Sequence, residues 1–425
     1  MRCTTVTNSS IEIGWLFRAI RAHAKLIRHY DGALPGWRHA TTMAMTTAVF
    51  VGDGSLLIQC AGAYLEAGHQ IRVIASENEA ILEWARARSV PAVHLDAHAN
   101  VAIPDVPFDY LFSVANLRVL PPELIARARK LAVNFHDAPL PRYAGLNATS
   151  WALMAQERTH GVTWHEMTAA VDAGRIVRQA SFEIAPDDTA FSLNARCYEA
   201  GLATFVAILQ DLARDELALT PQQGSRSYFG RDRRPESLAT LDWSHPAAQL
   251  AALVRALDFG AYPNPLALAK VNLGRGVLTV RTARVMEGGS RTAPGTVIAV
   301  DGDQMRVATG QGDLMLGGCI APDGLALAQA VAPGTVLPEL DGAQAQMLAA
   351  RTPQIARGEA HWMRAMAAAR AVTLPYPSGH GNAAAPAQRP PRRVPLSIPA
   401  DGATTIAAFF AWLSALTGQE CVSAL

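Results

Sequence analysis

Residues 131–145 read LAVNFHDAPLPRYAG, a hydrophobic run that leads directly into a segment containing two prolines and a glycine. The run LAV is typical of a buried strand, and the segment after it is typical of a loop that leaves the carboxyl end of that strand. Asn134 and His136 are two residues apart, so an extended backbone places both side chains on the same face. In open α/β sheets, ligands bind at the carboxyl ends of the strands. We therefore expect a functional site at the end of this strand.

An amide, an imidazole and a carboxylate in this region are the groups that acyl transfer requires. Asn134 can donate an N–H to the oxyanion of a tetrahedral intermediate, an interaction worth about 3 kcal/mol. His136 can accept a proton from an attacking amine, or stabilise the oxyanion when the ring is charged. Asp172 can hydrogen-bond to His136, fix its tautomer and favour its charged form. A strand end with a capped turn and a solvated aspartate explains the same residues taken singly.

Five short motifs follow one another between residues 134 and 174, and their order favours the catalytic interpretation. They read NFH at 134–136, LPRYAG at 140–145, WA at 151–152, GVTWHEM at 161–167 and DAG at 172–174. This series resembles the formyltransferase family that takes its one-carbon unit from 10-formyltetrahydrofolate. In that family the motifs are N-x-H, L-P-x-Y-x-G, W-A, G-x-T-x-H-x-M and D-x-G.

The resemblance implies a formyltransferase fold with Asn134, His136 and Asp172 as catalytic residues and 10-formyltetrahydrofolate as co-substrate. Residues 168–172 are expected to bind the pterin largely through the backbone. The residues that the resemblance assigns to cofactor binding are Arg118, Val119, Leu120, Leu140, Pro141, Gly145, Thr168 and Val171. His94 and His98 are four residues apart but lack a third ligand, so we expect no metal site.

One departure from the family pattern concerns the acceptor. Family members that act on nucleotide sugars place an arginine just after the loop glycine. In this chain Leu146 and Asn147 follow Gly145. This difference disfavours a nucleotide-sugar acceptor.

The composition excludes several other classes of protein. The 425 residues are enough for two or three domains, and half of them are hydrophobic. The formal net charge of +1 creates no long-range field for nucleic acid, which argues against a nucleic-acid partner and against transfer RNA as a substrate. The five scattered cysteines contain no C-x-x-C and fit a reducing compartment, so we expect a cytoplasmic protein. No apolar run is long enough to span a membrane, so we expect no membrane partner.

From residue 46 onward, strands alternate with helices, which predicts a doubly wound, mostly parallel α/β sheet. We expect this catalytic domain to occupy residues 46–230, with Ser55 capping the first helix. The strands are expected at 48–51, 71–74, 110–114 and 131–134, and helices at 79–88 and 193–212. Residues 1–45 are interpreted as an extension outside the fold; a basic amphipathic targeting helix is the alternative.

After a basic hinge at 228–235, the pattern of alternating strands and helices ends. A helix at 248–257 is expected to precede short strands separated by Gly-Asp and Pro-Gly turns. This domain, residues 236–345, resembles the small open β-barrel appended to related formyltransferases. Its strands are expected at 267–271, 277–280, 297–300, 305–308 and 314–316.

The end of the chain changes character again. We expect a helical segment at 354–377 and a flexible tail at 378–425, because residues 378–397 are rich in proline, alanine, glycine and arginine. The ending FFAWLSALTGQ, residues 409–419, resembles stretches that lead into condensation or adenylation domains of nonribosomal peptide synthetases. A disordered tail with a terminal amphipathic helix fits the same residues.

These observations together favour a folate-dependent N-formyltransferase that acts on an amine of an amino-acid-derived acceptor. The acceptor is expected on a peptidyl carrier protein, with an adenylation domain as a further partner, in nonribosomal peptide biosynthesis. Four alternatives stay open: a methionyl-tRNA formyltransferase, an amino-sugar formyltransferase, a formyltetrahydrofolate hydrolase and a degenerate, non-catalytic interaction module. The intact Asn134, His136 and Asp172 argue against the module, and the second domain argues against the hydrolase because water needs no receiving surface.

Overall fold

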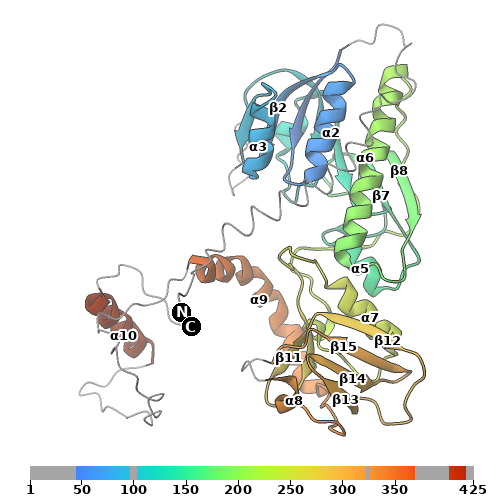
Figure 1. Ribbon diagram of the computed structural model, residues 1–425. Helices are drawn as coiled ribbons and strands as arrows, with labels where there is room; N and C mark the ends of the chain where they lie inside the picture. The colour runs from blue at the N-terminus through green and yellow to red at the C-terminus, as the bar shows by residue number, and fades with distance from the viewer. Residues whose placement is uncertain (1–44, 96–102, 322–325, 369–401, 418–425) are drawn as a thin grey trace, which may run out of the picture. The chain divides into compact units, whose positions relative to one another are not determined.

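The computed structural model describes residues 45–95, 103–321, 326–368 and 402–417 (Figure 1). The expected extension, His98 and most of the expected linker lie outside these residues. The chain divides into two compact units, Met1–Phe229 and Gly230–Leu425, which are described separately.

The first unit contains a seven-stranded sheet in the order β3-β2-β1-β4-β5-β7-β8. Strands β1 to β5 pair in parallel, and β7 and β8 are antiparallel, so the expected mostly parallel sheet is confirmed. The order reverses between β1 and β4, which is the kind of switch point where α/β proteins bind ligands. The strand bounds are Thr47–Val51 (β1), Gln70–Ser76 (β2), Ala92–His94 (β3), Phe108–Ser113 (β4), Ala128–His136 (β5), Thr159–Glu166 (β7) and Ile176–Glu183 (β8).

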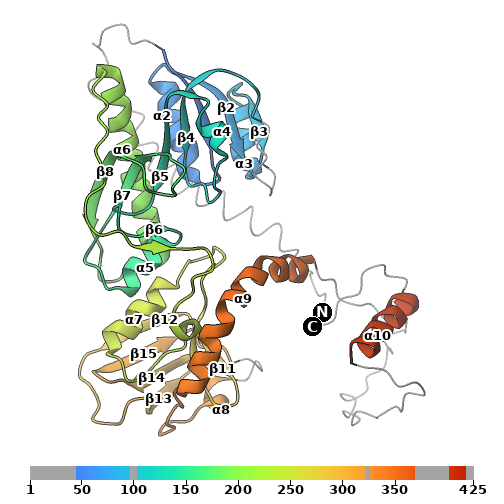
Figure 2. The ribbon, with the colours of Figure 1, turned by 180° about the vertical axis from the view of Figure 1, so that it is seen from behind.

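Helices cover both faces of this sheet. The helices α2 and α6 pack against each other over one face, where Phe50, Phe112 and Phe205 form an aromatic core (Figure 1). The short helix α4 contributes to the core of the opposite face (Figure 2). The helix bounds are Ser55–Glu66 (α2), Glu79–Arg86 (α3), Pro122–Ile125 (α4), Ala148–Met154 (α5) and Ala190–Arg214 (α6).

The expected cap of α2 is wrong by one residue. The N-cap is Gly54, with φ −90° and ψ 159°, and Ser55 is the first helical residue. A Cβ on Gly54 would lie 2.7 Å from both the Ala115 Cβ and the Tyr198 hydroxyl oxygen. The crowded position excludes a side chain, so the helix begins without a side-chain cap.

The alternation of side chains along β5 determines on which face of the sheet its last polar residues lie. Val133 and Phe135 are buried in the core beneath α2 and α6, whereas Ala132 belongs to the core of the other face. Asn134 and His136 therefore project from the same face as Ala132, beyond the end of its hydrophobic cluster.

The second unit contains short strands, as expected, and these strands pair antiparallel. A four-stranded sheet has the order β12-β15-β14-β13, and β10 pairs with β11. The strand β12 was not predicted, because its five residues include none that is fully buried. The strand bounds are Ala269–Asn272 (β10), Val277–Val280 (β11), Thr282–Met286 (β12), Val297–Asp301 (β13), Gln304–Ala308 (β14) and Asp313–Gly317 (β15).

Helices complete the second unit and the described part of the tail. α7, Ala247–Ala256, packs on β12 and β15, and α8 covers Leu327–Ala330. α9, Gly342–Ala368, begins earlier than the segment expected from 354 and contacts the 3-10 turn Glu236–Ala239. α10 covers Gly402–Thr417. Among the described helices, none is both long and apolar enough to cross a bilayer.

Candidate active site

Two antiparallel strands and one loop bring the polar side chains of the site together. β5 ends on Asn134 and His136, and its pairing with β7 sets Asn134 directly opposite His165. The connection between β7 and β8, residues 167–175, carries Asp172 back to the same place. The structure thus unites Asn134, His136 and Asp172, and it adds His165 to them.

The carboxylate of Asp172 lies between two imidazoles. Its Oδ1 is 3.4 Å from His165 Nε2, and its Oδ2 is 3.8 Å from His136 Nδ1. The backbone N–H of Gly145 donates to Oδ2 at 2.8 Å. The expected hydrogen bond between Asp172 and His136 is not formed at this distance, and Asp172 lies closer to His165.

This environment keeps Asp172 ionised. Burial favours the neutral carboxyl, but the neighbouring imidazoles of His165 and His136 and the hydrogen bond from the N–H of Gly145 together lower its pKa to about 2. At neutral pH the site therefore contains a buried negative charge.

The hydrogen bonds of each ring indicate where its proton lies. His136 Nε2 is 2.8 Å from the Tyr143 carbonyl oxygen and must donate, so the free lone pair is on Nδ1. His165 Nδ1 donates to the Glu166 carbonyl at 2.9 Å. His165 Nε2 then accepts from the Asn134 carboxamide nitrogen at 3.1 Å. If His165 gains a proton, the same Nε2 can donate to Asp172.

His165 is the site residue that the sequence did not assign. It lies within the motif GVTWHEM, and only that motif pointed to it. Its role depends on lying opposite Asn134, and the pairing of β5 with β7 was not part of the predicted strands. The histidine is 3% exposed, so it acts on its neighbours rather than on solvent.

The loops of the site have an unusual backbone. Tyr143, Asn147 and Asp172 all have left-handed backbones, with φ between 51° and 59°. Such residues cost of order 1–3 kcal/mol each and persist only where the surroundings impose them. Gly145, between the first two, has φ 98°, and a Cβ on it would lie 2.2 Å from the Phe229 carbonyl oxygen. Only glycine fits this position.

The residues expected to bind the cofactor differ in their exposure to solvent. Val119 and Val171 are 74% and 41% exposed, and Thr168 is also exposed. Three others, Leu120, Leu140 and Pro141, are buried.

Arg118 is occupied by two carboxylates. Its Nη1 is 2.6 Å from Asp53 Oδ2, and its Nη2 is 2.5 Å from Glu77 Oε1. Asp53 also accepts hydrogen bonds from the Ser76 hydroxyl and the Glu77 N–H. The guanidinium therefore ties the loop after β4 to the ends of β1 and β2.

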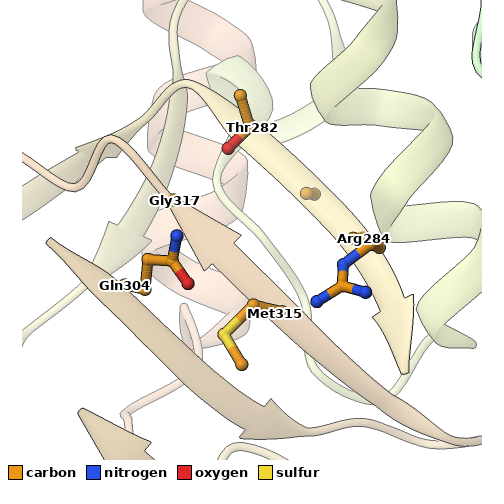
Figure 3. A pocket seen from close by; sticks show the side chains of 6 residues that line it. Thr282, Arg284, Gln304, Met315 and Gly317 are labelled. Carbon is orange, nitrogen blue, oxygen red and sulfur yellow. The ribbon is translucent and has the colours of Figure 1, made fainter. Parts of the chain in front are cut away.

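A hollow lies on the exposed face of the four-stranded sheet in the second unit (Figure 3). Its volume is about 260 Å³, and a Cβ on Gly317 would lie 2.6 Å from the Thr282 hydroxyl oxygen. The guanidinium of Arg284 has no ion pair within the described ranges. The lining residues, which include no nucleophile and no acid–base pair, are Thr282, Ala283, Arg284, Gln304, Met315 and Gly317. No group of three or more potential metal ligands occurs among the residues that the structure describes.

The fold and the site define an α/β enzyme architecture suited to acyl transfer, with an amide donor, two imidazoles and an ionised carboxylate at the end of β5. Two family models match the chain: formyl transferase over residues 66–209 and formyl transferase, C-terminal domain, over residues 236–329. The chain belongs to the formyltransferase family.

Known proteins show the same relationship. A methionyl-tRNA formyltransferase of Acidithiobacillus ferrooxidans is 33% identical over 208 residues, which are 49% of this chain and 64% of that protein. The match thus spans less than two thirds of that relative.

Solved structures share the fold. WlaRD, a sugar 3N-formyl transferase crystallised with dTDP and 5-N-formyl-THF, has a TM-score of 0.51 at 17% identity and covers 64% of this chain and 98% of its own. An N-formyltransferase from Helicobacter canadensis, in complex with folinic acid and dTDP-3-aminofucose, has a TM-score of 0.52 at 16% identity, with 65% and 100% coverage. At these identities the likeness shows the fold alone.

Proposed function

We propose that the protein transfers a formyl group from 10-formyltetrahydrofolate to an amine of an amino-acid-derived acceptor. The observation that carries this proposal is the meeting of Asn134, His136, His165 and Asp172 at the carboxyl end of β5. Family membership supports folate as the source of the formyl group.

Asn134 is the proposed donor to the oxyanion that forms when an amine nitrogen attacks the formyl carbon. Its carboxamide carries two N–H groups, and one of them is held by His165 Nε2. The second N–H remains for the oxyanion, and loss of such a donor costs about 3 kcal/mol in comparable sites. His165 therefore orients the amide before the reaction begins, which is what makes a fixed donor effective.

His136 is the proposed proton acceptor. Its Nε2–H is used by the Tyr143 carbonyl, so the amine proton passes to Nδ1, which lies 3.8 Å from the ionised Asp172. The new C–N bond forms to the acceptor, and the bond between the formyl carbon and N10 of the folate then breaks. The proton held by His136 is returned to that leaving nitrogen.

The finer part of the proposal concerns the acceptor. A carrier-bound aminoacyl group is supported by the ending FFAWLSALTGQ, which resembles synthetase sequence, and by Leu146-Asn147, where sugar-specific members have an arginine. Methionyl-tRNA is the second candidate, because the relative that is 33% identical is a methionyl-tRNA formyltransferase. The formal net charge of +1 favours the first candidate over the second.

A panel of amines with 10-formyltetrahydrofolate tests the proposal. The acceptors are an amino-acid amide, an aminoacyl carrier protein, methionyl-tRNA and a dTDP-amino sugar, and products are identified by mass. We expect formylation of the aminoacyl carrier protein to be fastest. Release of formate without a formylated amine would identify a hydrolase, and folate binding without turnover would identify a non-catalytic module. Either result contradicts the proposal.

A further inference from the structure

Residues 220–229 run along both loops of the candidate site. At one end, Thr220 exchanges two backbone hydrogen bonds with Ile176, of 2.7 and 2.9 Å. At the other end, β9, Tyr228–Phe229, pairs with β6, Ala144–Gly145. The segment is thus anchored to the start of β8 and to the loop after β5.

Gln222 lies between these anchors and holds the Asp172 loop directly. Its Nε2 donates to the carbonyl oxygens of Asp172 at 2.9 Å and Gly174 at 2.8 Å. The carboxamide nitrogen must face them, because the reversed amide would set three oxygens against one another. Arg226 adds a hydrogen bond from Nη2 to the Val171 carbonyl at 2.9 Å.

Asp172 needs such support because its backbone is left-handed, with φ 51°. This conformation is unfavourable for a residue with a Cβ, and it persists where surrounding contacts hold the backbone. Within the loop, the Ala173 N–H and the Thr168 hydroxyl both donate to the Ala170 carbonyl, and neither bond holds the Asp172 carbonyl. The carbonyl is held by Gln222 instead, from a segment 50 residues further along the chain.

We propose that Gln222 is a positioning residue for formyl transfer, because the two hydrogen bonds of its carboxamide hold Asp172 where the carboxylate meets both imidazoles. The chemical role of Asp172 in this inference rests on the proposed function. Loss of the two hydrogen bonds releases the loop, and the carboxylate then moves away from Gly145 and His136.

The substitution Gln222→Met tests this proposal, since methionine has a similar length but no N–H donor. We expect kcat to fall about 10-fold to 10²-fold, the effect of a displacement near 1 Å, with little change in KM for folate or amine. Gln223→Met is the matched control, because Gln223 is exposed and its side chain makes no hydrogen bond in the described part of the chain. The melting temperatures of both variants separate loss of fold from loss of position.

Hydrogen–deuterium exchange supplies a readout that needs no turnover. The N–H of Gly145 donates to Asp172 Oδ2, so it is protected while Asp172 is in place. We expect faster exchange in the peptide that contains Gly145 in Gln222→Met, and unchanged exchange in β2. If the wild-type protein formylates no acceptor, the proposed function fails, and the exchange result still decides this inference.

Gln222→Glu adds a pH signature that a merely structural residue would not show. An ionised glutamate repels the two carbonyl oxygens, whereas a protonated one can donate a single O–H. The ratio of its kcat to the wild-type kcat should therefore rise as the pH falls. Wild-type kcat together with wild-type exchange at Gly145 in Gln222→Met overturns the proposal.

Discussion

Each side chain of the candidate site is held by a contact with another member of the site, which consists of Asn134, His136, His165 and Asp172. The carboxylate of Asp172 contacts both imidazoles, and one of these imidazoles contacts the Asn134 amide. A substitution at any of the four therefore changes the surroundings of the others. We expect their effects on the rate to be non-additive, as they are for other groups that act as a unit.

Asn134→Ala tests the proposed oxyanion donor. We expect transfer to slow by roughly 10²–10³-fold, the cost of removing one such donor, while folate binding changes little. The measurements are kcat from product mass and folate affinity from fluorescence titration. Turnover at the wild-type rate would remove Asn134 from the mechanism.

Asp172→Asn tests the buried carboxylate. The variant keeps the size of the side chain but cannot stabilise a charged imidazole, so we expect kcat to fall by a factor between ~10² and ~10⁴. Single-turnover rates with saturating folate and amine measure this loss. Asp187→Asn is a matched control, because Asp187 is exposed and its side chain makes no hydrogen bond or ion pair among the residues that the structure describes.

The lowered pKa of Asp172 also predicts how the free energy of unfolding depends on pH. Its folded pKa is about 2 against an ordinary value of 3.8, so its contribution is fully present above pH 4 and is lost as the pH falls toward 2. The shift corresponds to about 2 kcal/mol of unfolding free energy. Urea unfolding at pH 7 and pH 3 should show a smaller loss for Asp172→Asn than for the wild type. Equal losses in the two proteins would contradict the prediction.

At the scale of loops and strands, Gly145 connects the loop after β5 to β9. Gly145→Ala places a methyl group against the Phe229 carbonyl, so we expect destabilisation of about 1–3 kcal/mol and reduced activity. Gly224→Ala is the matched control: Gly224 has φ 102°, but nothing lies within 4 Å of an added Cβ. Its cost should be limited to the left-handed backbone, about 1 kcal/mol. Thermal unfolding of the two variants would show no difference if the close approach to Phe229 were unimportant.

The elements that could be predicted are those that bury a hydrophobic pattern. Runs of apolar residues predict strands at four places, and each run overlaps a strand of the structure, namely β1, β2, β4 and β5. β8 and β12 have one fully buried residue and none, respectively, so their sequences carry no comparable signal. Their pairing partners hold them in place, and such pairing is not visible in a local stretch of sequence.

At the scale of the whole chain, α9 determines how many residues can be removed from the C-terminal side without loss of stability. Arg234 of the segment that opens the second unit pairs with Glu359 of α9, and the Arg234 side chain is only 9% exposed. A protein that ends after residue 350 loses this partner and two thirds of α9, so we expect the second unit to lose about 1–3 kcal/mol of unfolding free energy. A protein that ends after Ala368 keeps both and should retain stability and activity. Equal melting temperatures for the two truncated proteins would show that α9 is dispensable.

The sequence by itself determined the doubly wound sheet, because hydrophobic strands alternate with helices along the chain. It also determined that Asn134 and His136 share a face, because side chains alternate along a strand. Only the tertiary structure decided that His165 lies opposite Asn134, that Asp172 is nearer to His165 than to His136, and that Gln222 holds the Asp172 loop. These relations depend on the antiparallel pairing of β5 with β7 and on left-handed loop residues. Both are imposed by contacts between residues far apart in sequence, which leave no periodic pattern to read.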